Sequence, residues 1–321
     1  MSLVIFIVGG AGYIGSHMVK QAHLAGHKVV TLDNLSTGHK DAVKYGKFEY
    51  CDIHNLKRLR ELFNIYQPDV VMHFAAFSIV GESVLDPYKY YYNNVSGVLN
   101  LLKTMVDFKC NKFIFSSSAA VYGNPEYTPI DELHPKKPIN PYGKSKLMVE
   151  EMLKDFDSAY GLKYISFRYF NAAGHDPEGE LSERHHPETH LLPLVMQTAN
   201  GERESISIFG SDYNTPDGTC VRDYIHVNDL CQAHLKGLEN LMSHNKNNTS
   251  RVYNLGNERG YSVEEVIQSV KDITGKQFTV INQERRNGDP DTLVASCGKA
   301  KKELSIMFRY SKLSDIIQTL I

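Results

Sequence analysis

Hydrophobic residues form short runs that alternate with longer amphipathic stretches along the first half of the chain. Apolar runs cover residues 3–8, 28–33, 48–53, 69–76, 112–118 and 163–171, and helical patterns cover 55–66, 87–108 and 141–160. Near-continuous apolar strands separated by helices are typical of a parallel sheet that is covered on both faces. The pattern therefore predicts an α/β fold with a doubly wound parallel sheet, whose ligands bind beyond the carboxyl ends of the strands.

The pattern changes after residue 171. Residues 172–190 are rich in Gly, Pro, Glu and His and show no periodicity, and the remainder mixes short strands and helices. We expect residues 1–171 to form a nucleotide-binding domain, with part of 206–229 returning to it. Residues 172–321 are expected to form mainly a smaller, mixed α/β substrate domain.

Charge and cysteine content exclude several classes of protein. The chain of 321 residues has 35 basic and 37 acidic residues, a net charge of −2, which gives no electrostatic reason to bind nucleic acid or an anionic membrane. Its five cysteines include no C-x-x-C pair, so neither a disulfide framework nor a thiolate zinc site is indicated. The first apolar run lacks the basic segment of a signal peptide, and no run is long enough for a membrane span. We therefore expect a cytoplasmic protein.

The turn after the first strand has the spacing of a phosphate-binding loop. Its spaced glycines are Gly9, Gly12 and Gly15. They allow a tight turn and the approach of a pyrophosphate to the following helix N-terminus, as in Rossmann folds. Asp33 ends the next strand, 18 residues after the last glycine, where a carboxylate can accept a hydrogen bond from a ribose 2′-hydroxyl and would repel a 2′-phosphate. Residues 34–38 contain no arginine, so we predict NAD rather than NADP; the alternative is a structural turn in a cofactor-free domain.

Tyr142 and Lys146 lie four residues apart on the helix that Pro141 opens. An ammonium beside a phenol favours the phenolate, and a nicotinamide cation would add to this effect. The spacing alone is weak evidence, since about one chance Tyr-x-x-x-Lys is expected in this chain. Its position is more informative, because the preceding strand ends in three serines, residues 116–118. A serine hydroxyl there could bridge a substrate oxygen to Tyr142; the alternative is a hydrogen-bonded strand end.

Taken together, these motifs resemble the extended short-chain dehydrogenase/reductase family. The resemblance includes Asp33-Asn34, residues 73–76 and Asn94. Further motifs, which are similar to the nucleotide-sugar epimerases of that family, lie at residues 168–171, 187–191, 217–227 and 285–290. The resemblance therefore covers nearly the whole chain.

The resemblance implies an NAD-dependent isomerase that interconverts UDP-glucose and UDP-galactose. The implied mechanism is oxidation at C4 to a 4-keto intermediate, rotation of the sugar, and return of the hydride from bound NADH. Related dehydratases and decarboxylases carry a carboxylate just after the serine, where this chain has Ala119 and Ala120, which favours epimerisation. Two alternatives stay open: an epimerase for UDP-N-acetylglucosamine and UDP-N-acetylgalactosamine or for both sugar pairs, and a non-catalytic NAD-binding protein.

By the resemblance, the catalytic residues are Ser118, Tyr142 and Lys146. The implied cofactor contacts are Gly9, Gly12, Tyr13, Ile14, Gly15, Asp33, Asn34, Ser36, Thr37, Gly38, Asp52, Ile53, Phe74, Ala75, Ala76, Ser78, Asn94, Ser116, Tyr142, Lys146 and Phe170. The implied substrate contacts are Ser118, Tyr142, Asn171, His190, Leu191, Phe209, Arg222, Tyr224, Arg286 and Asp289. The partners are then a UDP-hexose and a second copy of the chain, which meets the helices near 87–108 and 141–160.

The two arginines suit a diphosphate, since each guanidinium can bind it in a bidentate manner; the alternative is a salt bridge to Asp223 or Asp289. Two positions depart from the family pattern. Some epimerases have a lysine at Ser78. Leu293 stands where the family places a residue that borders the sugar 2-position, and its intermediate bulk leaves the acceptance of an N-acetyl group open.

Three histidines, His185, His186 and His190, lie in the irregular segment. They could suggest a metal site. They lack a facing carboxylate spacing such as H-E-x-x-H, so we expect no metal there.

Overall fold

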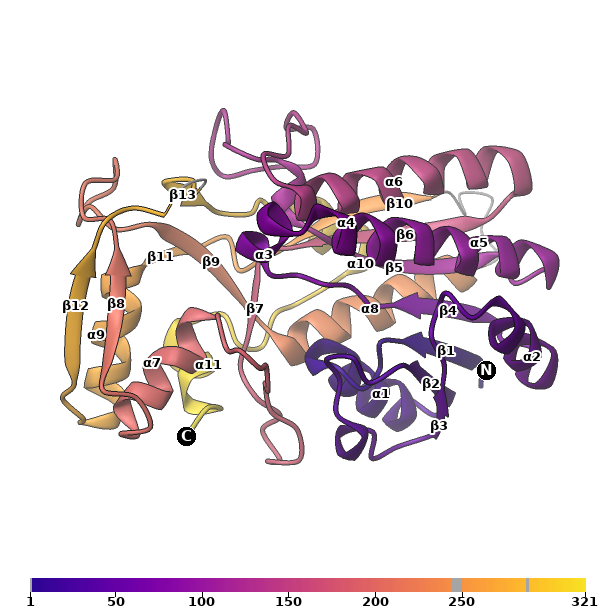
Figure 1. The fold of residues 1–321 in the computed structure, drawn as a ribbon, viewed down its shortest axis with the longest axis horizontal. Coiled ribbons are helices and arrows are strands. Elements are labelled where there is room, and N and C mark those ends of the chain that lie inside the picture. The colour runs from indigo at the N-terminus through magenta and orange to yellow at the C-terminus, as the bar shows by residue number, and fades with distance from the viewer. Residues whose placement is uncertain (1, 244–249, 287–288) are drawn as a thin grey trace.

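A parallel seven-stranded sheet forms the centre of the computed structural model, which describes residues 2–243, 250–286 and 289–321. Its strands are β1 (Val4–Val8), β2 (Lys28–Asp33), β3 (Lys47–Tyr50), β4 (Val70–His73), β5 (Lys112–Ser118), β6 (Lys163–Tyr169) and β10 (Arg251–Leu255). They follow the order β10-β6-β5-β4-β1-β2-β3 (Figure 1). The order reverses between β1 and β4, which is where open parallel sheets bind ligands.

Helices cover both faces of this sheet, which confirms the predicted doubly wound α/β fold (Figure 1). Side chains alternate along β1, since Ile5 and Ile7 join one buried cluster and Phe6 and Val8 another. The first cluster includes side chains of α1 (Tyr13–Leu24), α8 (Val227–Met242) and α10 (Gly298–Leu304). The second includes side chains of α2 (Leu56–Tyr66), α5 (Val98–Asp107) and α6 (Pro141–Tyr160).

The helical pattern at 87–108 is interrupted in the structure. It consists of α4 (Pro87–Tyr91), a π-helical segment η2 (Tyr92–Gly97), and α5. A short helix, α3 (Val80–Leu85), precedes it, and single 3₁₀ turns lie at η1 (Lys40–Ala42) and η3 (Ala119–Val121). The π segment carries Asn94 as a buried residue that bonds to neighbouring elements. Such wide turns are common at functional sites.

The second lobe has two small sheets. β7 (Asn171–Ala173), β9 (Val221–His226), β11 (Gly260–Ser262) and β13 (Thr292–Leu293) form one, and β8 (Ser205–Phe209) pairs with β12 (Thr279–Gln283) in the other. The helices of this lobe are α7 (Leu191–Ala199), α9 (Val263–Thr274) and α11 (Leu313–Gln318), which share one hydrophobic cluster. The lobe lies at the left of Figure 1.

The chain passes between the two lobes more often than the sequence indicated. The predicted strand at 163–171 splits at Phe170, whose N–H binds Leu255 O at 3.0 Å, so that β7 pairs with β9 instead of continuing the large sheet. The return to the large sheet is made by α8 and β10, whereas β8 and β9 belong to the smaller sheets. Within the expected returning segment, 206–229, Ile225 at the end of β9 and the start of α8 join the buried cluster against the large sheet. The boundaries of the two domains stay a prediction.

No helix in the described part of the chain is both long enough and apolar enough to span a bilayer.

Candidate functional site

The glycine turn closes tightly against the end of β4. Gly9 has φ +82°, and a Cβ there would lie 2.7 Å from Ala75 Cα. A Cβ on Gly15 would overlap the Gly9 carbonyl oxygen and lie 2.8 Å from Gly10 Cα. Only glycine fits these positions, so the turn brings the N-terminus of α1 to the point where the strand order reverses.

The N-terminus of α1 is open to an anion. Its N-cap residue, Gly12, provides no side-chain hydrogen bond, and its first turn holds no acidic residue. The first N–H groups of a helix lack intrahelical partners and attract negative charge. The backbone cradle therefore fits a diphosphate.

Asp33 lies beside this turn. Its carboxylate accepts hydrogen bonds from the N–H groups of Ala11 (3.0 Å) and Leu35 (2.7 Å). Burial raises its pKa, and the two N–H groups oppose this rise. An oriented carboxylate next to a diphosphate cradle is suited to a ribose hydroxyl, so these residues fit NAD.

Several other predicted cofactor contacts lie around the same turn. Asn34 donates to Asp52 at 2.8 Å and accepts from the N–H of Ser36 at 3.0 Å. A Cβ on Gly38 would lie 2.9 Å from Ala11. Thr37 lies in the same loop, and Ile53 is buried against Gly97 of the π segment.

Some of the predicted cofactor contacts also form hydrogen bonds or packing contacts within the protein. The Asn94 amide is bonded to both the N–H (3.0 Å) and the carbonyl (2.9 Å) of Phe77 and donates to Ser145 Oγ at 3.2 Å. It therefore fixes the loop after β4 to α6. This loop contains the predicted residues Phe74, Ala75, Ala76 and Ser78. Tyr13 donates to Gly174 O at 2.5 Å, Ile14 packs on the core, and Phe170 is buried.

Tyr142, Lys146 and Ser118 come together at the end of β5. Asn140 caps α6 by accepting from Gly143 N at 2.9 Å, and Pro141 starts the helix, which sets Tyr142 in its first turn. Ser118 forms a side-chain hydrogen bond with Tyr142. Lys146 Nζ donates to Ser116 O at 2.7 Å and lies 5.8 Å from the Tyr142 ring centroid.

Burial has the largest effect on the pKa values of Tyr142 and Lys146. It raises the pKa of Tyr142, and the bond from Ser118 opposes the rise. It also lowers the pKa of Lys146 to about 7, while Glu150 acts in the opposite direction. The protein side chains alone therefore do not supply the lowered tyrosine pKa that the Tyr-x-x-x-Lys pattern predicts.

A buried polar network below this group was not predicted. Glu150 accepts from Ser117 Oγ at 2.6 Å and from the Arg168 guanidinium at 2.9 and 2.6 Å. Arg168 also donates to the Tyr122 hydroxyl at 2.8 Å, which in turn donates to Asn254 at 2.6 Å. The network joins α6, β5, β6 and β10. The sequence could indicate that Glu150 lies on the same helix face as Lys146, four residues earlier. It could not indicate the partners of Glu150, because they are distant in the chain.

Predicted substrate residues lie in the second lobe. Asn171 and Tyr224 pair across β7 and β9, and their side chains are hydrogen bonded. Arg222 and Arg286 approach the same carboxylate, Asp289, at 3.8 and 2.8 Å. The Arg286 guanidinium also lies 4.9 Å from the centroid of the Phe209 ring. Asn287 and Gly288 of the same motif lie outside the described residues.

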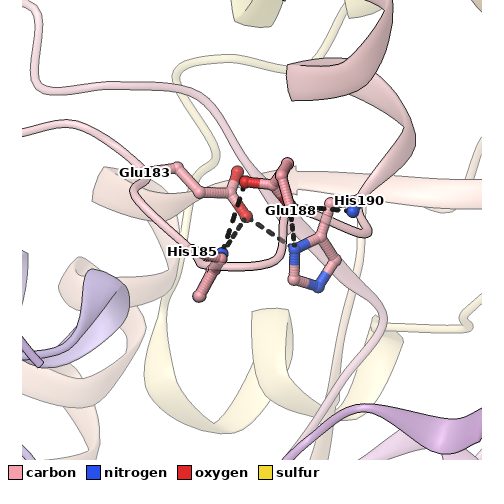
Figure 2. A group of neighbouring side chains, drawn as sticks. All are labelled: Glu183, His185, Glu188 and His190. Atoms are coloured by element: carbon pink, nitrogen blue, oxygen red, sulfur yellow. Dashed lines mark hydrogen bonds and ion pairs between the residues drawn. The ribbon is translucent and has the colours of Figure 1, made fainter. Parts of the chain in front are cut away.

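His190, at the N-cap of α7 before Leu191, belongs to another group (Figure 2). Its Nδ1 lies 2.8 Å from Glu183 and 3.2 Å from Glu188, and His185 Nδ1 lies 3.2 Å from Glu183. Burial alone would lower the pKa of both histidines, but the carboxylates outweigh it and raise the pKa of His185 to about 9 and of His190 to about 10. The carboxylates that meet these histidines come from the same irregular segment and do not follow the H-E-x-x-H spacing.

Comparison with known proteins agrees with this geometry. The model of the NAD dependent epimerase/dehydratase family matches residues 5–256. A UDP-glucose 4-epimerase from Lacticaseibacillus casei is 46% identical over 318 residues, 99% of this chain and 95% of that protein.

Solved structures are similarly close. The UDP-glucose 4-epimerase of Brucella ovis in complex with NAD has a TM-score of 0.95 and 47% identity, covering 99% of this chain and 97% of that one. The enzyme from Bifidobacterium longum in complex with NAD⁺ and UDP has a TM-score of 0.93 and 35% identity, covering 98% and 96%.

These findings confirm the predicted cofactor, NAD, and the predicted class of enzyme, an NAD-dependent epimerase, which is an isomerase. They also confirm the predicted family, because the match extends over nearly the full length. The chain belongs to the NAD-dependent epimerase/dehydratase family.

Proposed function

We propose that this enzyme interconverts UDP-glucose and UDP-galactose by reversible oxidation at C4. The observation that carries the proposal is the meeting of Ser118, Tyr142 and Lys146 at the carboxyl end of β5. Lys146 Nζ donates to Ser116 O and lies 5.8 Å from the Tyr142 ring centroid. Burial raises the pKa of Tyr142, and Ser118 lowers it. Ala119 and Ala120 follow the serine, so this position offers no carboxylate for removing water. The full-length similarity to UDP-glucose 4-epimerases supports the same reaction.

In this mechanism Tyr142 takes the proton of the sugar 4-hydroxyl, directly or through Ser118. Tyr142 returns the proton after the keto sugar has rotated to present its other face. When bound, NAD supplies a positive ring that favours the Tyr142 phenolate and that takes up and returns the C4 hydrogen as hydride. Lys146 would hold the nicotinamide ribose. Asp33 and the N-terminus of α1 would hold the adenosine ribose and the diphosphate.

Substrate binding must be firm at the nucleotide and loose at the sugar, because the 4-keto sugar has to present its other face. Arg222 and Arg286 would hold the substrate diphosphate. Asp289, which both approach in the protein, would keep the two guanidinium groups aimed at that position. Asn171, Tyr224, Phe209 and the start of α7 would complete the substrate site.

The test is incubation of the purified protein with UDP-galactose and no added NAD, following UDP-glucose. We expect conversion by the wild type and a loss of about 10²–10⁴-fold in kcat for Tyr142→Phe, the usual contribution of a positioned acid or base. Tyr160→Phe is the matched control, since Tyr160 ends the same helix with 59% of its surface exposed. Absence of conversion by wild-type protein that contains bound NAD would refute the assignment.

Leu293 provides the test against the N-acetylated sugars. It pairs with Arg222 across β13 and β9 and packs on the cluster that includes Ala119 and Phe170. A side chain here would limit the room beside the sugar 2-position. We expect Leu293→Ala to raise the ratio of kcat/KM for UDP-N-acetylgalactosamine to that for UDP-galactose by about tenfold, within the range that one or two methylenes supply. An unchanged ratio would remove Leu293 from the specificity site.

A further inference from the structure

We propose that Glu183, His185, Glu188 and His190 form a structural binding site for a divalent transition metal, with Zn²⁺ as the fitting ion. The four residues lie at the end of the long connection between β7 and α7. One ligand atom from each lies within 4.8 Å of all the others. Figure 2 shows the two carboxylates and the two imidazole rings turned toward one another.

The separations between the nitrogen and oxygen atoms are close to those of a tetrahedral zinc site. His190 Nδ1 lies 2.8 Å from Glu183 Oε1 and 3.2 Å from Glu188 Oε1. His185 Nδ1 lies 3.2 Å from Glu183 Oε1 and 3.6 Å from the other Glu188 oxygen, Oε2. In a tetrahedron with metal–ligand bonds of about 2.0–2.1 Å, neighbouring ligand atoms are about 3.3–3.4 Å apart. Small movements of the side chains would therefore complete the coordination.

Glu183 gives a second and independent indication. Its side chain is 1% exposed, and neither of its carboxylate oxygens makes a hydrogen bond of regular geometry with the described residues. The buried Nδ1 of His185 likewise lacks one. Buried carboxylates are normally hydrogen bonded or bound to metal. Within the part of the chain that the structure describes, Glu183 has ion pairs with the two imidazoles but no hydrogen bond of regular geometry. A metal ion that displaces the imidazole protons would bind these same atoms.

A neighbouring acidic group shows the contrast. Asp176, Glu178 and Glu180 also converge, but Lys20 Nζ lies among them at 2.8, 2.6 and 3.0 Å. An ammonium already occupies the position between those carboxylates. Among the described residues, the cationic groups that face the carboxylates at 183–190 are imidazoles. Two nitrogen with two oxygen donors favour Zn²⁺ over Mg²⁺ or Ca²⁺.

The local backbone holds Glu188 in place. Its Oε1 accepts from the N–H groups of Thr189 (2.8 Å) and His190 (2.9 Å). Such outer contacts orient metal ligands. Four protein ligands would leave no open position, so the ion would have a structural role. It would fix the connection beside Tyr13 of α1, whose ring lies 6.1 Å from that of His185.

The first experiment measures zinc in the NAD-containing protein by elemental analysis, after incubation with Zn²⁺ and gel filtration. We expect one ion per chain in the wild type and at least about 100-fold weaker zinc binding in His185→Gln and Glu183→Gln, since even outer-shell changes cost 10–100-fold. His186→Gln is the matched control, because His186 is in the same loop but outside the cluster; it should bind zinc like the wild type.

A second measurement does not depend on the variants folding. Titration of the wild type with Co²⁺ should give the intense visible bands of tetrahedral cobalt, which Zn²⁺ should abolish. Added Zn²⁺ should also raise the unfolding temperature of the wild type and of His186→Gln. The proposal is overturned if the wild type binds no more zinc than His185→Gln, or binds cobalt without tetrahedral bands, because the cluster is then an ion-paired network only. Neither readout requires epimerase activity.

Discussion

At the residue scale, the three serines that end β5 contact different groups. The Ser117 hydroxyl donates to Glu150 at 2.6 Å, below the catalytic group. Ser118 bonds to Tyr142, and the Ser116 carbonyl accepts from Lys146. Successive strand residues point to opposite faces, so 116 and 118 share one side. The position of the three serines alone could not choose among them, because the choice depends on which face of β5 meets the start of α6. Only the family resemblance indicated Ser118.

Ser118→Ala should change the pH dependence of kcat. The Ser118 bond lowers the pKa of Tyr142, and the base must be deprotonated to accept a proton. Without the bond the pKa is higher, so the rising limb of the kcat profile should move to higher pH and part of the activity should return in alkaline buffer. Steady-state rates between neutral and alkaline pH measure this shift.

Ser117→Ala is the control for that shift. It removes a hydrogen bond to Glu150 but none to Tyr142. We therefore expect a less stable protein whose kcat profile rises at the same pH as that of the wild type. A limb that moves equally in both variants would contradict the role given to Ser118.

At the scale of elements, the sequence predicts those helices whose ends are set by capping residues close in the chain. The helix at 141–160 matches α6, because Asn140, Pro141 and Gly161 mark its ends by capping. The π segment in 92–97 was not predicted, since the hydrophobic pattern continues through it. The bonds from Asn94 to Phe77 and Ser145 that accompany it are tertiary contacts.

The cluster at 183–190 was missed for a related reason. Its carboxylates and histidines lie in a connection without helix or strand. Spacing motifs such as H-E-x-x-H assume a helix, where residues four apart share a face. In an irregular connection the backbone path decides which side chains meet.

Gly15→Ala tests the turn before α1. The added methyl would overlap the Gly9 carbonyl and crowd Gly10, so the turn would open and the cradle would distort. We expect a lower unfolding temperature and less NAD released on denaturation. Gly298→Ala is the control, since a Cβ there meets no atom within 4 Å; equal NAD content and stability in the two variants would show that the turn tolerates a side chain.

Arg168→Met tests the buried network. Arg168 and Glu150 are 3% and 1% exposed, and removing one partner of a buried pair leaves an uncompensated charge. We expect the free energy of unfolding to fall by about 3–5 kcal/mol, measured by denaturant titration. Arg251→Met on β10 removes a partly exposed contact with Glu303 at 3.5 Å and should cost less than about 1 kcal/mol. Similar losses in both variants would contradict the interpretation.

At the scale of the whole molecule, α5 and α6 lie side by side on one face of the sheet (Figure 1). They expose apolar side chains, including Leu99 at 45% and Met148 at 49%. The homodimer through these helices stays a prediction, and these side chains offer positions at which to test it. Formation of the dimer would bury such residues.

We expect light scattering to give twice the mass of one chain for the wild type and the mass of one chain for Leu99→Glu with Met148→Glu. Leu24→Glu, at the end of α1 on the other face of the sheet, changes a leucine that is 61% exposed; this variant should stay dimeric. A wild-type monomer, or a dimer that survives the double change, would place the interface elsewhere or remove it.

The last strand of the large sheet has a consequence for synthesis. β10 pairs with β6 along its whole length, from Arg251 opposite Ile165 to Leu255 opposite Tyr169, yet the ribosome makes β7, β8 and β9 between them. Until β10 emerges, the nascent nucleotide-binding lobe has an open apolar strand edge, which other chains can join. The two lobes are therefore finished together, and a gene cut after residue 171 would encode a fragment prone to associate.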